Sequence, residues 1–262
     1  MVQILAVLVY LVMVIVNGLA NTLPLNGVTT GEVSEAYQNL FAPAGITFVI
    51  WGLIYLLLAV YVLYQVGLFQ GDKSDVKGEL LNKVGLLFIV SSLANAAWIF
   101  AWHYDLISLS MILMIVILLS LIYTMKYILQ EELNSKEKFM IKLPFSVYFG
   151  WITVATIANA TVLLVSLNWN GFNIAEPIWA VIIIITGMLI GGAVSIRYKD
   201  AVYSLVLVWA YAGIYIKHVS AAGFAGQYPS VITTVIICII VLLAISAYSF
   251  ITRRRHTGTL FL

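Results

Sequence analysis

The sequence contains few charged residues and a single cysteine. Only 9% of its 262 residues are charged, whereas a soluble globular domain has about a quarter. Hydrophobic residues make up 63%, which places the chain among integral membrane proteins. Cys238 is the only cysteine, so an intrachain disulfide and a cysteine-based metal site are both excluded. The net charge of +2, without a basic patch, predicts no nucleic-acid partner.

The usual catalytic and metal-binding motifs are also missing from the sequence. Its three histidines are scattered, and none has the spacing of a metal site. No nucleophile elbow, zinc-binding helix motif, phosphate-binding loop or pair of catalytic carboxylates is present. We therefore predict no catalytic residue and no metal ligand, and the sequence favours a protein that is not an enzyme.

Long apolar runs separated by short polar segments predict eight membrane-spanning helices. A run of about 20 apolar residues is long enough to cross the hydrocarbon core of a bilayer. The expected fold class is therefore all-α, a polytopic membrane helix bundle. The predicted spans lie near residues 2–16, 41–65, 84–102, 106–128, 143–167, 176–196, 201–216 and 229–251.

The first apolar run, 2–16, has two interpretations. Small residues follow it as they do at a signal-peptidase site, but no Lys or Arg precedes it, so we expect a retained first span. Trp102 and Trp169 lie at the ends of predicted spans, and we expect both in the aromatic belt at the membrane interface.

The basic residues predict how the spans are oriented. Of the 13 Lys and Arg residues, all except Lys217 fall in loops and a tail that eight spans place on one side. An excess of Lys and Arg marks the cytoplasmic side, so both termini are expected in the cytoplasm. Because no organelle-targeting segment is apparent, we expect a bacterial plasma membrane. The residues on the inner side are Lys73, Lys77, Lys83, Lys126, Lys136, Lys138, Lys142, Arg197, Lys199, Arg253, Arg254 and Arg255.

Three predicted spans carry aromatic and amide residues at positions that share a helix face. In the second span, Trp51 and Tyr55 lie one turn apart, and Phe48 lies one turn earlier. In the third span, L-A-N-A-A-W ends at Trp98 and places Asn95 on the same face. The candidate site residues of the second, third and fifth spans are Pro43, Phe48, Trp51, Tyr55, Asn95, Trp98, Trp151 and Asn159.

Two interpretations of these residues are open. Asn95 and Asn159 either join helices through hydrogen bonds, which give about 0.6 to 2 kcal/mol each, or orient a bound ligand. Trp51, Trp98 and Trp151 either fill the core or form the walls of a flat apolar pocket, since aromatic faces stack on planar groups.

The motifs resemble those of the TspO family, the translocator or tryptophan-rich sensory proteins. Pro43 and the W-G-x-x-Y that follows match the family's second span, and the third-span run matches its L-x-N-x-x-W. In the fifth span, W-I-T-V-A-T-I-A-N is similar to the family's W-x-x-F-A-T-x-L-N. The resemblance implies an extended member, with a TspO-like five-helix domain at 1–168 and three additional helices with a basic cytoplasmic tail at 169–262.

The resemblance also implies a function. It implies that the candidate residues bind a hydrophobic planar ligand such as a porphyrin or heme, in a sensory or regulatory role that requires no cofactor. Ala160 stands where some bacterial members have a second Trp implicated in tetrapyrrole breakdown, so that reaction is not implied. The expected partners are a hydrophobic small molecule and membrane lipids, and a homodimer is left open. The alternative is a small-molecule transporter or exporter on the same bundle, which the three added helices and Lys217 favour.

Two further features lie in the later spans. Lys217-His218 either meets Glu176 or an anionic ligand group inside the bundle, or lets Lys217 extend to the outer surface. Gly187-x-x-x-Gly191 predicts a close approach between two helices.

Overall fold

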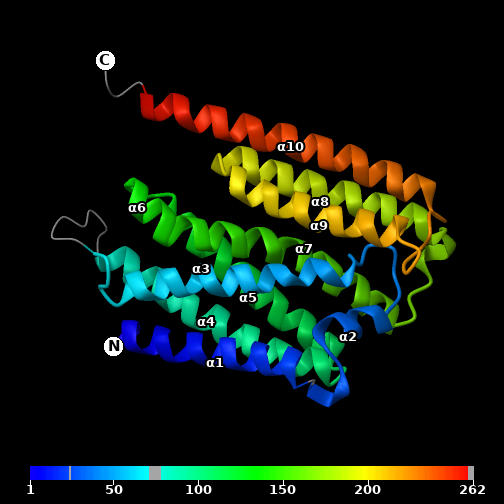
Figure 1. Ribbon diagram of the computed structural model, residues 1–262, viewed down its shortest axis with the longest axis horizontal. Coiled ribbons are helices and arrows are strands. Elements are labelled where there is room, and N and C mark those ends of the chain that lie inside the picture. Colours follow the sequence, from blue (N-terminus) through cyan, green and yellow to red (C-terminus); the bar gives the residue numbers. More distant parts are fainter. Residues whose placement is uncertain (24, 71–77, 259–262) are drawn as a thin grey trace. The chain divides into compact units, whose positions relative to one another are not determined.

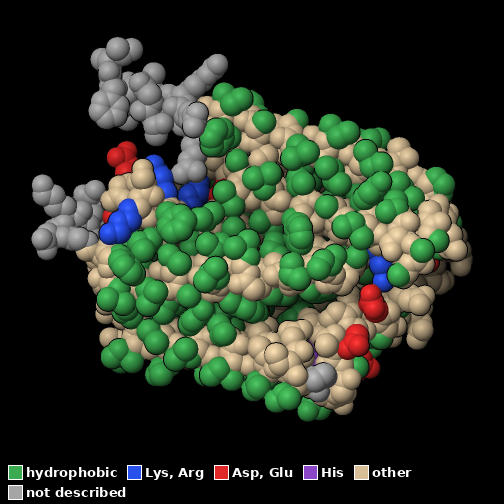
Figure 2. Space-filling model, viewed as in Figure 1, with side chains coloured by type: hydrophobic (Ala, Val, Ile, Leu, Met, Phe, Trp, Pro, Cys, Tyr) green, Lys and Arg blue, Asp and Glu red, His purple; other side chains and the backbone are tan. Residues whose placement is uncertain are grey.

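The computed structural model describes residues 1–23, 25–70 and 78–258, and the side chains of all these residues except 253–258 (Figure 1). This part of the chain consists of helices and their connections and contains no strand. Eight of its helices are long and apolar enough to cross a membrane, which confirms the predicted all-α, eight-span fold. Apolar side chains cover most of the face seen in Figure 2, as expected for helices that meet lipid. The predicted inner-side residues Lys73 and Lys77, and the side chains of Arg253, Arg254 and Arg255, lie outside the described part.

The chain divides into two compact units. Unit 1 contains residues 1–36 and 48–152, and unit 2 contains residues 37–47 and 153–262. One long helix, α7 (Leu143–Ser166), therefore contributes its first residues to unit 1 and its later residues to unit 2. The division predicted at residue 168 follows a family pattern rather than these contacts, and it stays a prediction.

Unit 1 is built around α4, the most buried of its spans. In Figure 1, α4 lies between α1 and α5 and packs against both. Small side chains on α4, including Ser91, Ser92, Ala94 and Ala96, are buried, and they let the neighbouring backbones approach closely. The helices of this unit are α1 (Val2–Thr22), α2 (Thr30–Ala36), α3 (Ile50–Gln65), α4 (Gly78–His103), α5 (Ile107–Ile128) and α6 (Ser135–Glu137), with the short helical turns η1 (Leu25–Gly27) and η3 (Lys138–Lys142).

Unit 2 contains the later part of α7 and three long helices, of which α10 packs against both others. A Cβ atom on Gly191 would meet the side chain of Leu207, and one on Gly187 would meet the hydroxyl of Tyr211. The two glycines therefore allow α8 and α9 to approach closely, which confirms the packing predicted from their spacing. The helices are α8 (Glu176–Tyr198), α9 (Ala201–Val219) and α10 (Pro229–Gly258), with the short turn η4 (Gly171–Asn173).

Residues 37–47 join unit 2 although they lead directly into α3 of unit 1. The Ala44 N–H donates to the Gly213 carbonyl at 3.0 Å, and the Trp209 indole N–H donates to the Thr47 carbonyl at 3.0 Å. A helical turn, η2 (Gly45–Val49), follows this extended stretch and precedes α3. Backbone groups of this segment that form no helical hydrogen bond instead bond to α9, and these bonds fix the segment along α9.

Several helices are longer than predicted. Helix α1 continues to Thr22, and α4 begins at Gly78 rather than near residue 84. Near the start of α4, the Lys83 ammonium contacts the Glu79 carboxylate at 2.6 Å. Charged residues were predicted to end the helices, but outside the hydrocarbon core their side chains reach water while the backbone keeps its helical hydrogen bonds.

Candidate functional site

A group of aromatic side chains in unit 1 packs around Trp51. The centroid of the Trp51 ring lies 5.6 Å from that of Tyr55, 6.4 Å from Trp98, and 6.1 Å from both Tyr148 and Trp151. These separations are within the range in which aromatic rings attract one another. The ring centroids of Phe48 and Trp151 lie 6.0 Å apart, and those of Trp98 and Trp102, which stack, lie 5.2 Å apart. We call this group the Trp51 cluster; its members are Phe48, Trp51, Tyr55, Trp98, Trp102, Tyr148 and Trp151.

Three helices each present two rings to the Trp51 cluster. On α3, Trp51 and Tyr55 lie one turn apart and stack with an interplanar angle of 18°. On α4, Trp98 and Trp102 have the same spacing and an angle of 20°. On α7, Tyr148 precedes Trp151 by three residues, so both also point to one face. The structure therefore brings the predicted residues of α3, α4 and the first half of α7 into one place.

Trp102 lies in the last turn of α4, and its expected position at the membrane interface stays a prediction. Its side chain is buried, and its indole N–H donates to the carbonyl of Thr30 at 3.1 Å. The α1–α3 connection, which contains α2, covers this end of α4. Trp102 thus belongs to the core, because residues distant in sequence fold over it.

Polar atoms without hydrogen-bond partners gather in and beside the Trp51 cluster. Within the described residues, no partner is found for Tyr55 Oη, Asn95 Nδ2, Tyr148 Oη and Trp151 Nε1, although all four atoms are buried. Leaving a buried polar group unpaired costs about 1 to 3 kcal/mol. Because all four groups can donate a hydrogen bond, this part of unit 1 is suited to a molecule that carries acceptor atoms.

Asn17 fixes the orientation of Asn95. Its Nδ2 atom donates to Asn95 Oδ1 at 2.8 Å and to the Met13 carbonyl at 2.9 Å. The acceptor oxygen of Asn95 is thereby used, and its amide nitrogen is the atom left without a partner. Asn17 is not among the predicted site residues, because it follows the predicted first span at 2–16, whereas α1 extends past it.

The remaining predicted site residues, Pro43 and Asn159, belong to unit 2. Both are buried, Pro43 in the segment before α3 and Asn159 in the later half of α7. Their participation in a common ligand site with the Trp51 cluster stays a prediction.

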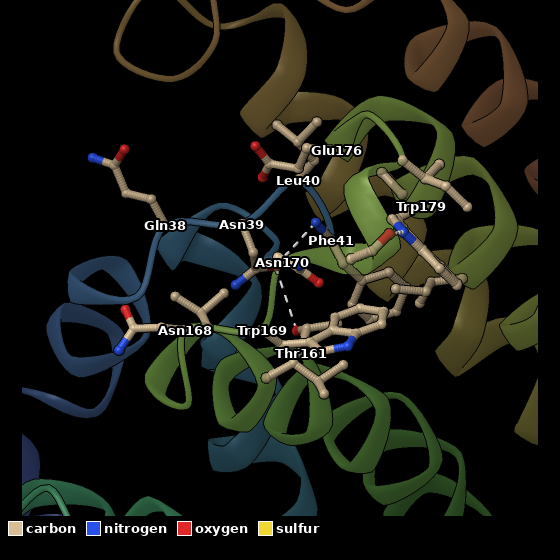
Figure 3. Close-up of a pocket in the computed structure, with 16 residues that line it drawn as sticks. Gln38, Asn39, Leu40, Phe41, Thr161, Asn168, Trp169, Asn170, Glu176 and Trp179 are labelled. Carbon is tan, nitrogen blue, oxygen red and sulfur yellow. Dashed lines mark hydrogen bonds between the residues drawn. The ribbon is translucent and has the colours of Figure 1, made fainter.

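A pocket of about 430 Å³ lies within unit 2 and contains none of the predicted site residues (Figure 3). Its walls come from residues 38–41, the end of α7, the loop 168–171 and the first two turns of α8. Trp169 was predicted only as an interfacial residue, yet it lines this pocket. The available signal was the turn-forming sequence N-W-N-G, which ends close to Glu176-Pro177.

His218 supports one wall of this pocket. Its imidazole is fully buried, and Nε2 donates to the carbonyl of Leu40 at 2.9 Å. Phe224 and Tyr228 surround the ring, with centroids 4.8 and 5.8 Å away. Lys217, the preceding residue, is half-buried in the last turn of α9. Among the described residues, no group of three His, Cys, Asp or Glu side chains could hold a metal ion.

The comparisons with known proteins give one match. A family model described as TSPO-like protein matches residues 3–248. The match runs from α1 into α10 and includes both the Trp51 cluster and the unit 2 pocket. No curated protein and no solved structure matches the chain.

Proposed function

Because the chain belongs to the TSPO-like protein family, we propose that it binds a hydrophobic planar ligand at the Trp51 cluster. The observation that carries this proposal is the set of four unpaired, buried donor groups among stacked indole and phenol rings. Such a site offers flat apolar faces together with a few directed hydrogen bonds, which are the usual components of a small-molecule site.

The chemistry of the cluster favours a conjugated ring system with acceptor groups at its edge. Indole faces attract a planar ligand by offset stacking, and the donors Asn95 Nδ2 and Trp151 Nε1 would bind its acceptor atoms. A porphyrin has both properties, since its macrocycle is planar and its propionates accept hydrogen bonds. Trp51, Tyr55 and Phe48 are half-buried, so α3 and the preceding turn η2 carry the accessible edge of the cluster. A sensory or regulatory role follows if ligand binding at this edge changes how α3 packs.

A titration with protoporphyrin IX tests the proposal. We expect saturable quenching of Trp fluorescence in detergent-solubilised protein, and an affinity that Trp51→Phe and Trp98→Phe each weaken roughly 2- to 12-fold, because each removes part of one stacking contact. Trp169→Phe is the matched control, since it changes an indole outside the cluster. Absence of saturable binding in folded protein, or equal affinity in all variants, would refute the proposal.

Small-molecule transport is the second candidate function. It is favoured by the half-buried cation Lys217, which lies at the end of a span opposite the other basic residues of unit 2. Flux of a labelled ligand in reconstituted vesicles, lost in Lys217→Ala, would support transport. Flux that is unaffected by Lys217→Ala would show that transport does not depend on Lys217, and this alternative would lose its support.

A further inference from the structure

We propose that the pocket of unit 2 is a second ligand site, which binds a small organic cation with an apolar substituent. This inference does not depend on the function proposed for the Trp51 cluster, because the two sites share no residue. A pocket volume of about 430 Å³ suits a ligand of this size.

The charge of the pocket lining favours a cation. Among the described residues that line the pocket, Glu176 is the only one with a formal charge, and none is Lys, Arg or His. Figure 3 shows the Glu176 carboxylate at the rim formed with residues 38–41. An anionic ligand would be repelled here and would find no basic partner, whereas a cation would be attracted.

Two indole rings form an aromatic wall of the pocket. The rings of Trp169 and Trp179 lie 5.1 Å apart with an interplanar angle of 59°. The Trp179 indole N–H donates to the Gly171 carbonyl at 2.8 Å, so this ring is held in place. Gly171 has a φ of +60°, and a Cβ atom there would lie 2.9 Å from Trp179 Nε1, so glycine alone fits. Two indoles, of which Trp179 is held in place, line the same pocket as a carboxylate, and indole faces recognise organic ammonium ions through cation–π attraction.

Two amide side chains of the pocket have oxygen atoms that already accept hydrogen bonds within the protein. Asn39 Oδ1 accepts hydrogen bonds from the backbone N–H of Phe41 at 3.0 Å and of Ala42 at 2.9 Å, and from the Thr161 hydroxyl at 3.4 Å. Asn170 Oδ1 accepts from the Phe172 N–H at 3.1 Å. These two amide oxygens therefore shape the pocket, and the groups that remain for recognition are the indole faces, the Glu176 carboxylate and the side chains of Gln38 and Asn168.

Apolar side chains of two helices can contact the substituent of the ligand. Leu164 and Val165 on α7 and Ala180 and Ile183 on α8 give the pocket apolar walls. An ammonium group at Glu176 would therefore place its hydrocarbon part between the two helices. This chemistry is shared by a choline or ethanolamine lipid headgroup and by a free amphipathic amine.

The test uses benzyltrimethylammonium as the probe and ligand-observed NMR on the full chain in dodecyl maltoside. We expect saturable binding that Trp169→Leu and Glu176→Gln each weaken roughly 5- to 30-fold, since each removes one of the two attractions. Glu132→Gln, which neutralises an exposed carboxylate outside the pocket, is the matched control and should bind as the unaltered protein does. The anionic analogue 3-phenylpropionate should not bind.

Circular dichroism of the same variants checks that they fold, and protoporphyrin binding to them separates the two proposals. No binding of the probe, equal binding by the isosteric Glu176→Gln variant, or preferred binding of 3-phenylpropionate would overturn the inference. Nanodiscs distinguish the natural source of the cation. A weaker apparent affinity in phosphatidylcholine than in an uncharged galactolipid without an ammonium group would assign the pocket to a lipid headgroup, and equal affinities would assign it to a free amine.

Discussion

The hydrogen bond between Asn17 and Asn95 is the residue-scale feature on which the Trp51 cluster depends. It joins α1 to α4 inside the membrane-spanning part of unit 1, where water cannot replace a lost partner. It uses the Asn95 oxygen and leaves the buried Asn95 amide nitrogen without a hydrogen-bond partner among the described residues. The Asn17–Asn95 pair thus holds the two helices together, and the proposed ligand site depends on the nitrogen that this pair leaves unpaired.

A double-mutant cycle measures this bond. Asn17→Ala, Asn95→Ala and the double variant should give a coupling free energy of about 0.6 to 2 kcal/mol, as for other hydrogen bonds between membrane helices. The measurement is reversible unfolding in mixed detergent. Thr22→Ala supplies the control, because its hydroxyl bonds only to Gly18 of its own helix and should show no coupling to Asn95. Additive effects of Asn17→Ala and Asn95→Ala would contradict the structure.

At the scale of elements, the close packing of α8 on α9 fixes the helix that forms one wall of the unit 2 pocket. Gly191 and Gly187 permit this approach, and the segment 37–47 is held against α9 by Gly213 and His218. A Cβ atom on Gly213 would meet the side chain of Thr47, so glycine is needed at this contact as well. Small residues at three points therefore determine where the pocket-lining segments lie.

Gly191→Ala tests this packing. The new methyl group would meet Leu207, so we expect a loss of about 1 to 3 kcal/mol in the free energy of unfolding, as for other overpacked sites. Gly18→Ala is the matched control, because no atom lies within 4 Å of the position of its Cβ. That control should be neutral or stabilising by up to about 1 kcal/mol, the helix preference of Ala over Gly. Equal effects of the two changes would argue against close contact of α8 and α9.

At the scale of the whole molecule, the spans and the basic residues together predict an orientation in the membrane. In unit 1, the Lys83 ammonium lies 5.3 Å from the centroid of the Tyr127 ring, so the start of α4 and the end of α5 lie at the same end of the unit. Lys126 lies in the last turn of α5. Lys136 in α6 and Lys138 in η3 follow it closely along the chain. We propose that this end faces the cytoplasm, with both termini on the same side.

Cysteine labelling tests the orientation. In a Cys238→Ala background, Phe172→Cys should react with an impermeant maleimide in intact cells, and Lys136→Cys should react only after permeabilisation. Both positions are exposed, and α7 separates them. The reverse pattern would invert the proposed orientation, and labelling of both positions in intact cells would show that α7 does not cross the membrane.

Particular residues show how far the sequence could predict the site. Trp51, Tyr55, Trp98 and Asn95 were identifiable because helical spacing places residues three or four apart on one face. Tyr148 lies three residues before Trp151 and carried the same signal, but its contact with Trp51 joins helices that are distant in the sequence and had no local signal. The unit 2 pocket was missed for the same reason.

The sequence by itself determined the eight helices and their order. A bilayer requires about 20 apolar residues for each span and internal hydrogen bonds for every backbone group, so composition alone fixes this part of the fold. Only the tertiary structure decided which rings meet, that residues 37–47 join unit 2, and that Asn17 binds Asn95. These contacts depend on the shapes of side chains brought together from distant segments, and no local pattern in the chain records them.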